Sequence, residues 1–517
     1  MTTTKPNPDV KPLLAAAIDI GSNAMRLRVA TVGSDGHIKV IFAHREAVRL
    51  GQDAFSSGIL SEATIARTEQ AFANFRHYLD QYPVEQLRAT GTSALRDAQN
   101  SAALIQRIHD SSGIDIDIIS GDEEGRLIHG AIYQRVPQIR KKTVLLIDIG
   151  GGSVEISLCV HGTIVALESF RMGTVRLLNL FHAAANPAAF QHLLHEYIAT
   201  MRDKVKKEIK GFKIDFCIGT GGNVECLAEL AETLIDCHHG NRIDSTAIDQ
   251  ICDRLEAMSI KDRIERLRLR PDRADVIIPA ALVLKSVMEL VDDAPLLVPG
   301  VGLAEGILVD LLAPQLTDVT TMKRQAIGWA KSMANKFHAD SKHAKRVRNA
   351  ASSLFTQLGA LHQLDKRDKL LLQVAAICHE IGIAVRANDH HRHAAYLIAS
   401  SPMIGLTEKE KMLLAMVVRC QRKSFPTINS SRLESFTHDE RERILKLALL
   451  LRLAIAINKE RNGDVRLAIC EAHAEGITIT LNGRGDMELE AWMVGKLSKL
   501  FKLVLKTPLH AVHTALC

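Results

Sequence analysis

Apolar and polar positions in the first part of the chain alternate in a way that predicts strands and helices in turn. Strand-like segments at residues 26–32 and 37–43 are followed by a helical pattern at residues 61–79. This succession of a two-residue period and a period near 3.6 is typical of a layered α/β fold. We therefore predict an α/β domain over residues 12–136.

The same pattern begins again near residue 137. Three strand-like segments lie between residues 143 and 169, in the order that the first half uses. Internal similarity of this kind indicates a duplicated unit. We predict a second, related α/β domain over residues 137–316, with a linker around residues 314–321.

Helical periodicity dominates beyond the second domain. Apolar side chains recur on one predicted helix face at Val347, Ala351, Leu354, Leu358 and Leu361. This pattern predicts a mostly α domain over residues 320–465. Alternation at residues 474–481 then predicts a small α+β domain over residues 466–517, with a helix as its last element.

One phrase occurs twice: an apolar strand that ends in an aspartate and continues into a glycine-rich turn. Its copies are AAAIDIGSN at residues 15–23 and VLLIDIGGGS at residues 144–153. Glycine tolerates positive φ and carries no side chain, so successive backbone N–H groups can converge on an anion. An aspartate at the end of the strand can hold a hydrated divalent cation. The duplicated turns predict a cleft that binds phosphoryl groups.

A third strand also ends in glycines, in the phrase Gly219-Thr-Gly-Gly-Asn223. One such turn alone is explained equally well as a tight connection, but three together favour phosphate-facing loops. None of the three continues into Gly-Lys-Ser/Thr, and none matches Gly-x-Gly-x-x-Gly of a dinucleotide-binding unit. ATP-type P-loop and Rossmann interpretations are therefore weak.

Two glutamates follow Ser120 at the start of a predicted helix. Ser120 and Glu123 have the spacing of a capping box, so Glu123 is explained as structural. Glu124 has no part in this capping box. A carboxylate beside a phosphate site can orient and deprotonate an attacking water. A glutamate in the first turn also complements the helix dipole, so a structural role for Glu124 stays open.

Further polar side chains accompany the glycine-rich turns. Ser153 and Glu155 place a hydroxyl group and a second carboxylate beside Asp148, and carboxylates ligate Mg²⁺ directly or through its water. The guanidinium groups of Arg96 and Arg273 suit phosphate oxygens geometrically. An arginine alone, however, is more often a surface ion-pair partner.

Composition narrows the class of protein. The 517 residues carry a formal charge of +6, which demands no nucleic acid, and the 5 Tyr and 2 Trp argue against base-stacking surfaces. The 9 cysteines form no Cys-x-x-Cys pair, as in a reduced cytoplasmic protein. No segment resembles a secretory signal or a membrane span, so we expect a cytoplasmic protein with no stable membrane insertion.

With these motifs assembled, the sequence resembles the Ppx/GppA family, which comprises exopolyphosphatases and guanosine pentaphosphate phosphohydrolases. The matching phrases, in family order, lie at residues 19–23, 90–96, 120–126, 148–155, 219–223 and 273–276. The resemblance implies a duplicated actin-like fold of the sugar kinase, Hsp70 and actin superfamily, with a cleft between its halves. It also implies Mg²⁺-dependent hydrolysis of a terminal phosphoanhydride.

The resemblance also implies a role for individual residues. It makes Glu124 the catalytic base that activates water, and it makes Asp148 and Glu155 the residues that organise Mg²⁺ and water. The residues expected to hold phosphates are Asn23, Arg96, Gly150, Gly151, Ser153, Gly221, Asn223 and Arg273.

The helical region resembles the HD-like domain that such proteins often carry. Working metal sites of that type need a histidine, a His-Asp pair and a later aspartate, whereas this sequence has His343, the pair His379-Glu380, and Asn458. Replacing a carboxylate with an amide removes an anionic ligand. We therefore expect a site without its metal, in a domain that extends a channel for a polyanion.

Four functional hypotheses follow. The leading one is release of terminal phosphate from inorganic polyphosphate by an enzyme that we expect to be a homodimer. The nearest alternative is hydrolysis of the 5′-phosphate of pppGpp at the same site. A third hypothesis is a non-catalytic phosphate or nucleotide sensor. The fourth is an HD-type phosphohydrolase that acts through the helical domain.

Overall fold

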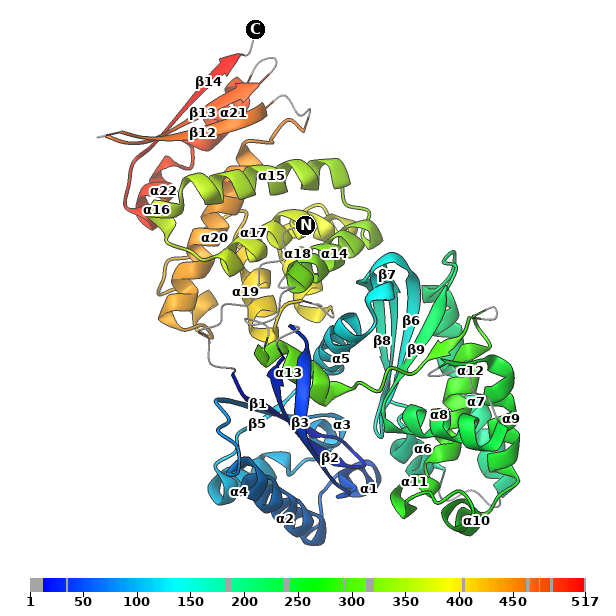
Figure 1. Cartoon of the computed structure of the whole chain (residues 1–517). Coiled ribbons are helices and arrows are strands. Elements are labelled where there is room, and N and C mark those ends of the chain that lie inside the picture. Colours follow the sequence, from blue (N-terminus) through cyan, green and yellow to red (C-terminus); the bar gives the residue numbers. More distant parts are fainter. Residues whose placement is uncertain are drawn as a thin grey trace. The chain divides into compact units, whose positions relative to one another are not determined.

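The computed structural model describes residues 13–33, 36–181, 187–235, 242–291, 294–312, 320–401, 405–461, 465–473, 475–483 and 487–515. The chain divides after residue 319 into two compact units. The first unit holds both α/β halves, and the second holds the helical region (Figure 1).

The first sheet is built around β1 (Ala15–Ile20). On one side, β2 (Met25–Val32) and β3 (Ile38–Glu46) continue the sheet antiparallel; on the other, β4 (Gln86–Gly91) and β5 (Ile116–Ile118) run parallel to it. Every residue of β1 is buried. Both faces of this strand are covered, which explains why its sequence is apolar except for Asp19.

Two cores cover the faces of this first sheet. One contains Ile18 with Phe72 and Phe75, and the other contains Ala17 with Ile128. The helices of this half are α1 (Leu50–Ser56), α2 (Glu62–Leu79), α3 (Ser93–Asp97), α4 (Ser101–Ser112) and α5 (Gly121–Arg135).

The second sheet repeats the arrangement around β6 (Thr143–Ile149). Its neighbours β7 (Val154–Val160) and β8 (Thr163–Phe170) are antiparallel, whereas β9 (Phe216–Thr220) runs parallel to β6. A short strand β11 (Leu296–Leu297) follows β9, and β10 (Arg242–Ile243) forms the edge. The matching order of strands confirms the predicted duplicated actin-like fold.

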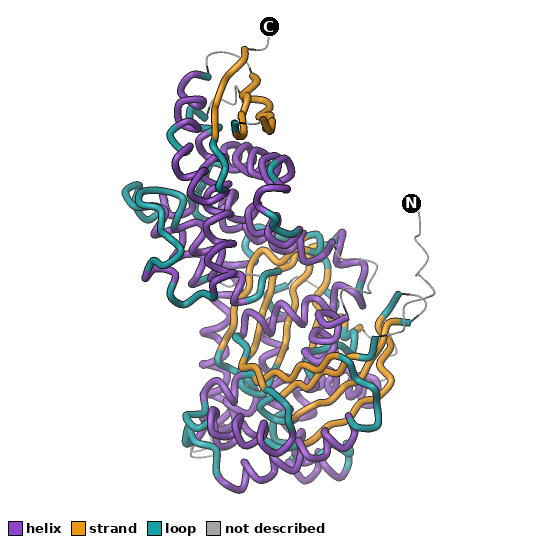
Figure 2. The backbone as a smooth tube through the Cα atoms, turned by 90° about the vertical axis from the view of Figure 1, so that its left-hand side faces the viewer, coloured by secondary structure: helices purple, strands orange, loops and turns teal. Residues whose placement is uncertain are grey.

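Helices lie beside the strands of the first unit (Figure 2). The second half of this unit has its own set of helices. They are η1 (Pro137–Lys141), α6 (Thr174–Leu180), α7 (Pro187–Glu208), α8 (Gly222–Ile235), α9 (Ser245–Glu256), α10 (Ile260–Glu265), α11 (Pro271–Ala274), α12 (Ile277–Met288) and α13 (Leu303–Leu312). Helix α13 returns to the first half, where Ile307 shares a core with Ala17 of β1 and Leu146 of β6. One core therefore joins the two halves.

The second unit is mostly helical. Its helices are α14 (Thr320–Lys336), α15 (Ser341–Gln357), α16 (Gly359–His362), α17 (Lys366–Cys378), η3 (Ile381–Ala384), α18 (His390–Ser400), α19 (Glu408–Arg419), η4 (Ser431–Leu433) and α20 (His438–Ala456). Val347, Ala351 and Leu354 of the predicted apolar face are fully buried in its core. Of the predicted linker, residues 314–319 lie outside the described residues.

The end of the chain differs from its prediction. The last part of the chain contains a three-stranded sheet, formed by β12 (Val465–His473), β13 (Gly476–Gly483) and β14 (Leu509–Ala515). Two helices, α21 (Glu488–Gly495) and α22 (Ser498–Leu505), lie between β13 and β14 in the sequence. The last described element is thus a strand, and the expectation of a final helix was wrong. Strand β14 pairs in parallel with β13, and local hydrophobic periodicity does not reveal this pairing. Within the described residues, no helix is long and apolar enough to cross a membrane.

Candidate active site

The two copies of the aspartate–glycine turn lie against one another in the first unit. A cleft of about 100 Å³ is lined by residues of both turns, including Asp19, Asn23 and Asp148. A Cβ atom added at Gly151 would lie 3.0 Å from Ser22 Cβ, closer than side chains normally approach. Glycine at this position therefore lets the turn after β6 touch the turn after β1.

The third glycine-rich turn completes the cleft. Gly221 has a φ of +91°, a conformation that favours glycine, and α8 begins at the next residue. A Cβ atom at Gly222 would lie 2.8 Å from guanidinium nitrogens of both Arg26 and Arg273. The positive end of a helix and two arginines therefore meet at the same turn, an arrangement that attracts anions.

Three carboxylates are gathered beside these turns. Glu124, Asp148 and Glu155 each offer an oxygen atom within 4.8 Å of the others. Glu124 stands in the first turn of α5, while Asp148 and Glu155 are direct partners across the antiparallel ladder of β6 and β7. Their exposed fractions are only 8%, 9% and 2%. Burying three carboxylates so close together costs free energy unless a proton or a cation neutralises their charge.

The pKa values of this carboxylate cluster reflect its crowding. Burial, and then the charge of Asp148, raise the pKa of Glu155 to about 7. Burial raises the pKa of Asp148 to about 6, although a hydrogen bond from Thr220 opposes the shift. Burial and the charge of Glu155 raise the pKa of Glu124 well above its ordinary value, and Arg96 opposes this. The Glu124 carboxylate is thereby a stronger base than an ordinary glutamate.

The cluster has the donor atoms that Mg²⁺ prefers. Glu155 Oε1 accepts a hydrogen bond of 2.8 Å from Ser169 Oγ, whereas Glu155 Oε2 is buried and has no hydrogen-bond partner. Oxygen ligands are the usual partners of this hard cation. A buried carboxylate oxygen without a partner, next to two further acids, fits a divalent metal ion. Asp148 and Glu155 would hold it.

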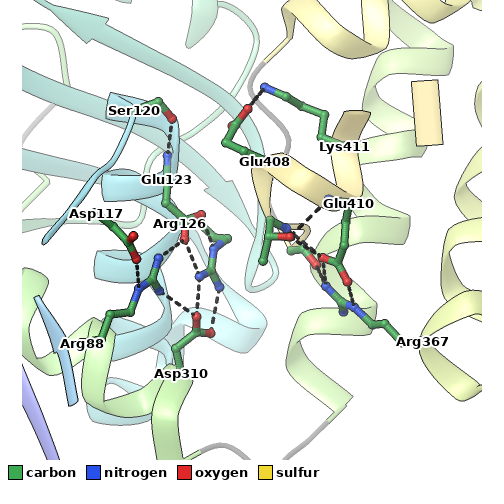
Figure 3. Close-up of polar contacts among 12 residues, drawn as sticks. Arg88, Asp117, Ser120, Glu123, Arg126, Asp310, Arg367, Glu408, Glu410 and Lys411 are labelled. Atoms are coloured by element: carbon green, nitrogen blue, oxygen red, sulfur yellow. Dashed lines mark hydrogen bonds and ion pairs between the residues drawn. The ribbon is translucent and has the colours of Figure 1, made fainter. Parts of the chain in front are cut away.

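Glu123 and Glu124 are adjacent in α5 but have different partners. Ser120 Oγ caps the helix by accepting from the Glu123 N–H at 3.2 Å. The Glu123 carboxylate does not complete the predicted capping box but binds Arg126 at 2.7 and 2.8 Å, and Arg126 also binds Asp310 (Figure 3). A bidentate guanidinium partner outcompetes the single backbone N–H. Glu123 is thus held in an ion-pair network, away from the chemistry.

Arginine and asparagine side chains line the cleft beside the carboxylates. Arg273 donates a short hydrogen bond to Asn223 Oδ1, and Asn223 Nδ2 donates to Thr174 Oγ1 at 3.0 Å. Asn23 Nδ2 donates to the backbone oxygen of Asp272 at 2.8 Å. Burial lowers the pKa of Arg273 to about 10, so its charge persists at neutral pH. These side chains are positioned before any ligand arrives.

Most residues singled out in the sequence line this cleft. They are Asn23, Glu124, Asp148, Gly150, Gly151, Ser153, Gly221, Asn223 and Arg273. Two are not among its lining residues, yet each contacts the carboxylate cluster. Arg96 Nη1 lies 3.5 Å from Glu124 Oε2, and Glu155 belongs to the cluster itself.

Sequence reasoning missed three arginines that line the cleft. Arg26 pairs with Asp19 at 3.3 Å, Arg28 pairs with Glu305, and Arg45 comes from β3. Arg26 and Arg28 alternate along β2 with buried apolar residues. Because side chains alternate between the two faces of a strand, this repeat was the available signal of a cationic face.

Metal-free protein is expected to lose stability as the pH rises. Folding raises the pKa of Glu155 from 4.5 to about 7, so the folded state keeps a proton that the unfolded chain has released. The resulting penalty grows through this interval and reaches about 3 kcal/mol above it. Thermal melting should therefore show Glu155→Gln as more stable than wild type at pH 8 and equal to it near pH 4. Mg²⁺ should stabilise only the wild type. Equal melting of the two proteins at pH 8 would argue against a buried, charged cluster.

Comparisons with known proteins agree with this geometry. The model of the Ppx/GppA phosphatase family matches residues 29–315, and that of Ppx/GppA phosphatase, domain III, matches residues 328–491. Similar curated proteins are the guanosine-5′-triphosphate,3′-diphosphate pyrophosphatases of Aeromonas hydrophila and Aeromonas salmonicida. They are 28% and 27% identical, and each alignment covers 90% of this chain and 92% of the relative.

Solved structures give the same result over part of the chain. An exopolyphosphatase from Cytophaga hutchinsonii is similar with a TM-score of 0.54 and 27% identity, over 58% of this chain and 98% of that one. The family member from Aquifex aeolicus is similar with a TM-score of 0.51 and 26% identity, over 59% and 99%. The cleft, with its glycine-rich turns, arginines and buried carboxylates, fits a phosphoanhydride hydrolase of this kind. The chain belongs to the Ppx/GppA phosphatase family.

Proposed function

We propose that this phosphatase is an exopolyphosphatase, which releases terminal orthophosphate from inorganic polyphosphate by Mg²⁺-dependent hydrolysis. One observation carries the proposal. Three buried carboxylates lie within 4.8 Å of one another, beside a cleft lined with glycine turns and arginines. Phosphoryl transfer needs mainly in-line positioning of a nucleophile and neutralisation of charge, and this arrangement supports both.

Glu124 is proposed as the catalytic base. A water molecule beside its carboxylate attacks the terminal phosphorus, and Glu124 accepts the proton that the water loses. The new bond joins the water oxygen to phosphorus, and the bond from phosphorus to the bridging oxygen breaks. The shortened chain leaves with that oxygen and takes a proton from solvent. Arg96, 3.5 Å from Glu124, orients the carboxylate and limits the rise of its pKa.

Asp148 and Glu155 are proposed to hold the divalent ion. When bound, Mg²⁺ neutralises phosphate oxygens and lowers the electrostatic cost of bringing a polyanion to three acids. Asp148 is kept in place by a hydrogen bond of 2.5 Å from Thr220 Oγ1, and Glu155 by Ser169. The protein thus fixes both carboxylates through hydroxyl donors.

The remaining lining residues are proposed to bind the phosphate groups. Backbone N–H groups of Gly151 and Gly221 contact non-bridging oxygens, with Ser153 as a hydroxyl donor. The Gly150 N–H already donates to Ser153 O at 3.0 Å, so Gly150 shapes the turn that holds these donors. Asn23, Asn223 and Arg273 add side-chain donors. A guanidinium group binds two oxygens at once and stays charged, which suits a substrate with no base or sugar.

Polyphosphate is favoured by what lines the cleft. Its lining residues include Arg26, Arg28, Arg45 and Arg273, and no aromatic side chain occurs among those described. A row of identical phosphates needs only repeated cationic and N–H donors, whereas a purine is often stacked on an aromatic side chain.

The second candidate is hydrolysis of the 5′-phosphate of pppGpp at the same site. Its support is that the Aeromonas relatives named for that activity match over 90% of this chain, in both units. The exopolyphosphatase structure covers only 58% of it. Both substrates end in a phosphoanhydride, so the same carboxylates and glycine turns would serve either one.

Phosphate release from long-chain polyphosphate and from pppGpp should be measured side by side with Mg²⁺. We expect kcat/KM for polyphosphate to exceed that for pppGpp by about tenfold or more, a difference of about 1.4 kcal/mol in transition-state binding. A preference for pppGpp would overturn the substrate assignment and leave the hydrolase assignment intact. An absence of release from both substrates would overturn the function itself.

A further inference from the structure

A second set of ligand-type side chains lies within the second unit. His343, His379 and Glu380 each offer one atom within 4.8 Å of the others. His343 belongs to α15, while His379 and Glu380 follow α17, which packs against α15. Their exposed fractions are 3%, 2% and 8%. The cluster therefore lies in the buried interior of the second unit.

Two imidazole nitrogens of this cluster have no partner. His379 Nδ1 lies 2.8 Å from the Ala376 carbonyl oxygen, so Nδ1 carries the proton and donates it. The lone pair is then on His379 Nε2, which is buried and makes no hydrogen bond. His343 Nδ1 is buried and unpaired as well. Buried polar atoms are nearly always satisfied, so two unpaired nitrogens on rings of one cluster point to a missing ligand.

The unpaired nitrogens belong to side chains that line a cavity of about 530 Å³. The other lining residues include five cations, Arg422, Arg452, Lys459, Arg461 and Lys496. Arg461 is paired with Glu380, while Arg452 donates to backbone oxygens of Cys420 and Lys423.

We propose that His343, His379 and Glu380 bind one borderline transition-metal ion of the Zn²⁺ class, whose open coordination positions accept a phosphate-bearing anion from the cavity. Two imidazoles and one carboxylate are a donor set that suits Zn²⁺ and its neighbours rather than Mg²⁺, which prefers oxygen ligands alone. Ligands about 2.1 Å from one ion lie about 3–4 Å apart. Atoms within 4.8 Å reach this arrangement by small side-chain rotations.

This inference departs from the expectation drawn from the HD-like pattern. That expectation rested on the loss of two aspartates, one replaced in the pair His379-Glu380 and the other by Asn458. The structure places the Glu380 carboxylate beside both imidazoles, so an anionic ligand is retained. Asn458 lines the same cavity, but its Nδ2 donates to Ala454 O at 2.9 Å and its amide adds no charge. Three protein ligands and an open face are typical of a metal ion that binds a further ligand.

The test uses full-length protein stripped of metal and then held in millimolar Mg²⁺, which occupies oxygen-only sites. Co²⁺ serves as the probe because its visible absorption bands report nitrogen ligands. We expect one equivalent of Co²⁺ per chain, displaced by Zn²⁺, and a change in the bands when inorganic phosphate is added. His343→Gln and His379→Gln should each weaken binding by about 100-fold.

Two controls separate this site from the others. His391→Gln removes another buried histidine with an unpaired Nδ1 outside the cluster, and it should leave Co²⁺ binding unchanged. Glu155→Gln should leave it unchanged as well. Phosphate release from polyphosphate by His379→Gln should stay within about threefold of wild type, so failure of the metal site and failure of the proposed hydrolysis are distinguishable.

The inference is overturned if wild type takes up no Co²⁺ in the presence of Mg²⁺, or if both histidine variants bind it as wild type does. Bands that do not respond to phosphate would overturn the anion-binding part. Circular dichroism establishes that each variant is folded. If one variant unfolds, the other variant and the wild-type stoichiometry still decide the question.

Discussion

Glu124→Gln is expected to lower kcat for phosphate release by about 1,000-fold while polyphosphate binding stays within about threefold. The amide keeps the size of the side chain but cannot accept the proton of the attacking water. Glu124 is buried in a cluster that raises its pKa, and Arg96 is its cationic neighbour. Rapid-mixing measurement of released phosphate gives kcat, and equilibrium titration gives the affinity. The loss should be the same on polyphosphate and on pppGpp, because the base serves both.

Glu123→Gln is the matched control, since Glu123 is also buried and lies in the same helical turn. Its carboxylate binds Arg126 rather than facing the cleft. This variant should lower the melting temperature by several degrees, yet keep kcat within about threefold, because it breaks an ion-pair network and leaves the base in place. Unchanged turnover in Glu124→Gln would remove the catalytic assignment. A wild type that binds polyphosphate without turnover would favour the sensor hypothesis instead.

Asp148→Asn is expected to raise the Mg²⁺ concentration needed for half-maximal activity by about 100-fold and to lower kcat as well. An amide has nearly the shape of the carboxylate but lacks the charge that a hard cation needs. Asp148 is the cross-strand partner of Glu155, so its replacement leaves a single acid on the ladder to hold the ion. Activity measured against Mg²⁺ concentration reports both effects.

Asp215→Asn is the control for this change. Asp215 lies just before β9 in the same half, and its carboxylate pairs with Lys142 at 2.9 Å, outside the cleft lining. We expect its Mg²⁺ dependence to match that of wild type. If Asp148→Asn also kept the wild-type dependence, Asp148 would not be a metal ligand.

Much of the fold could be predicted from local sequence. The apolar strands that contain Asp19 and Asp148 near their ends and continue into glycine turns are encoded within ten residues each, so their duplication was visible. The division after residue 319 fits the change from mixed to helical periodicity. Parallel pairing of β14 with β13 was not visible, because two helices separate these strands in the sequence.

The site was predictable only in part, because its parts meet through tertiary packing. Residues of the glycine turns were found from their motifs, whereas the cationic strand with Arg26 and Arg28 was missed. Pattern alone gave no distance between Glu124 and Glu155, which come from different halves of the fold. The unpaired nitrogens of the His343 and His379 rings depend on side-chain packing and could not be read from the sequence.

The position of the bound ion tests the central claim most directly. Crystals grown with Mn²⁺ in place of Mg²⁺, together with polyphosphate and the Glu124→Gln protein, would locate the ion by anomalous scattering. We predict a peak within about 4 Å of carboxylate oxygens of both Asp148 and Glu155, a distance that allows one bridging water. An ordered polyphosphate in the cleft with no peak beside these two residues would contradict the account.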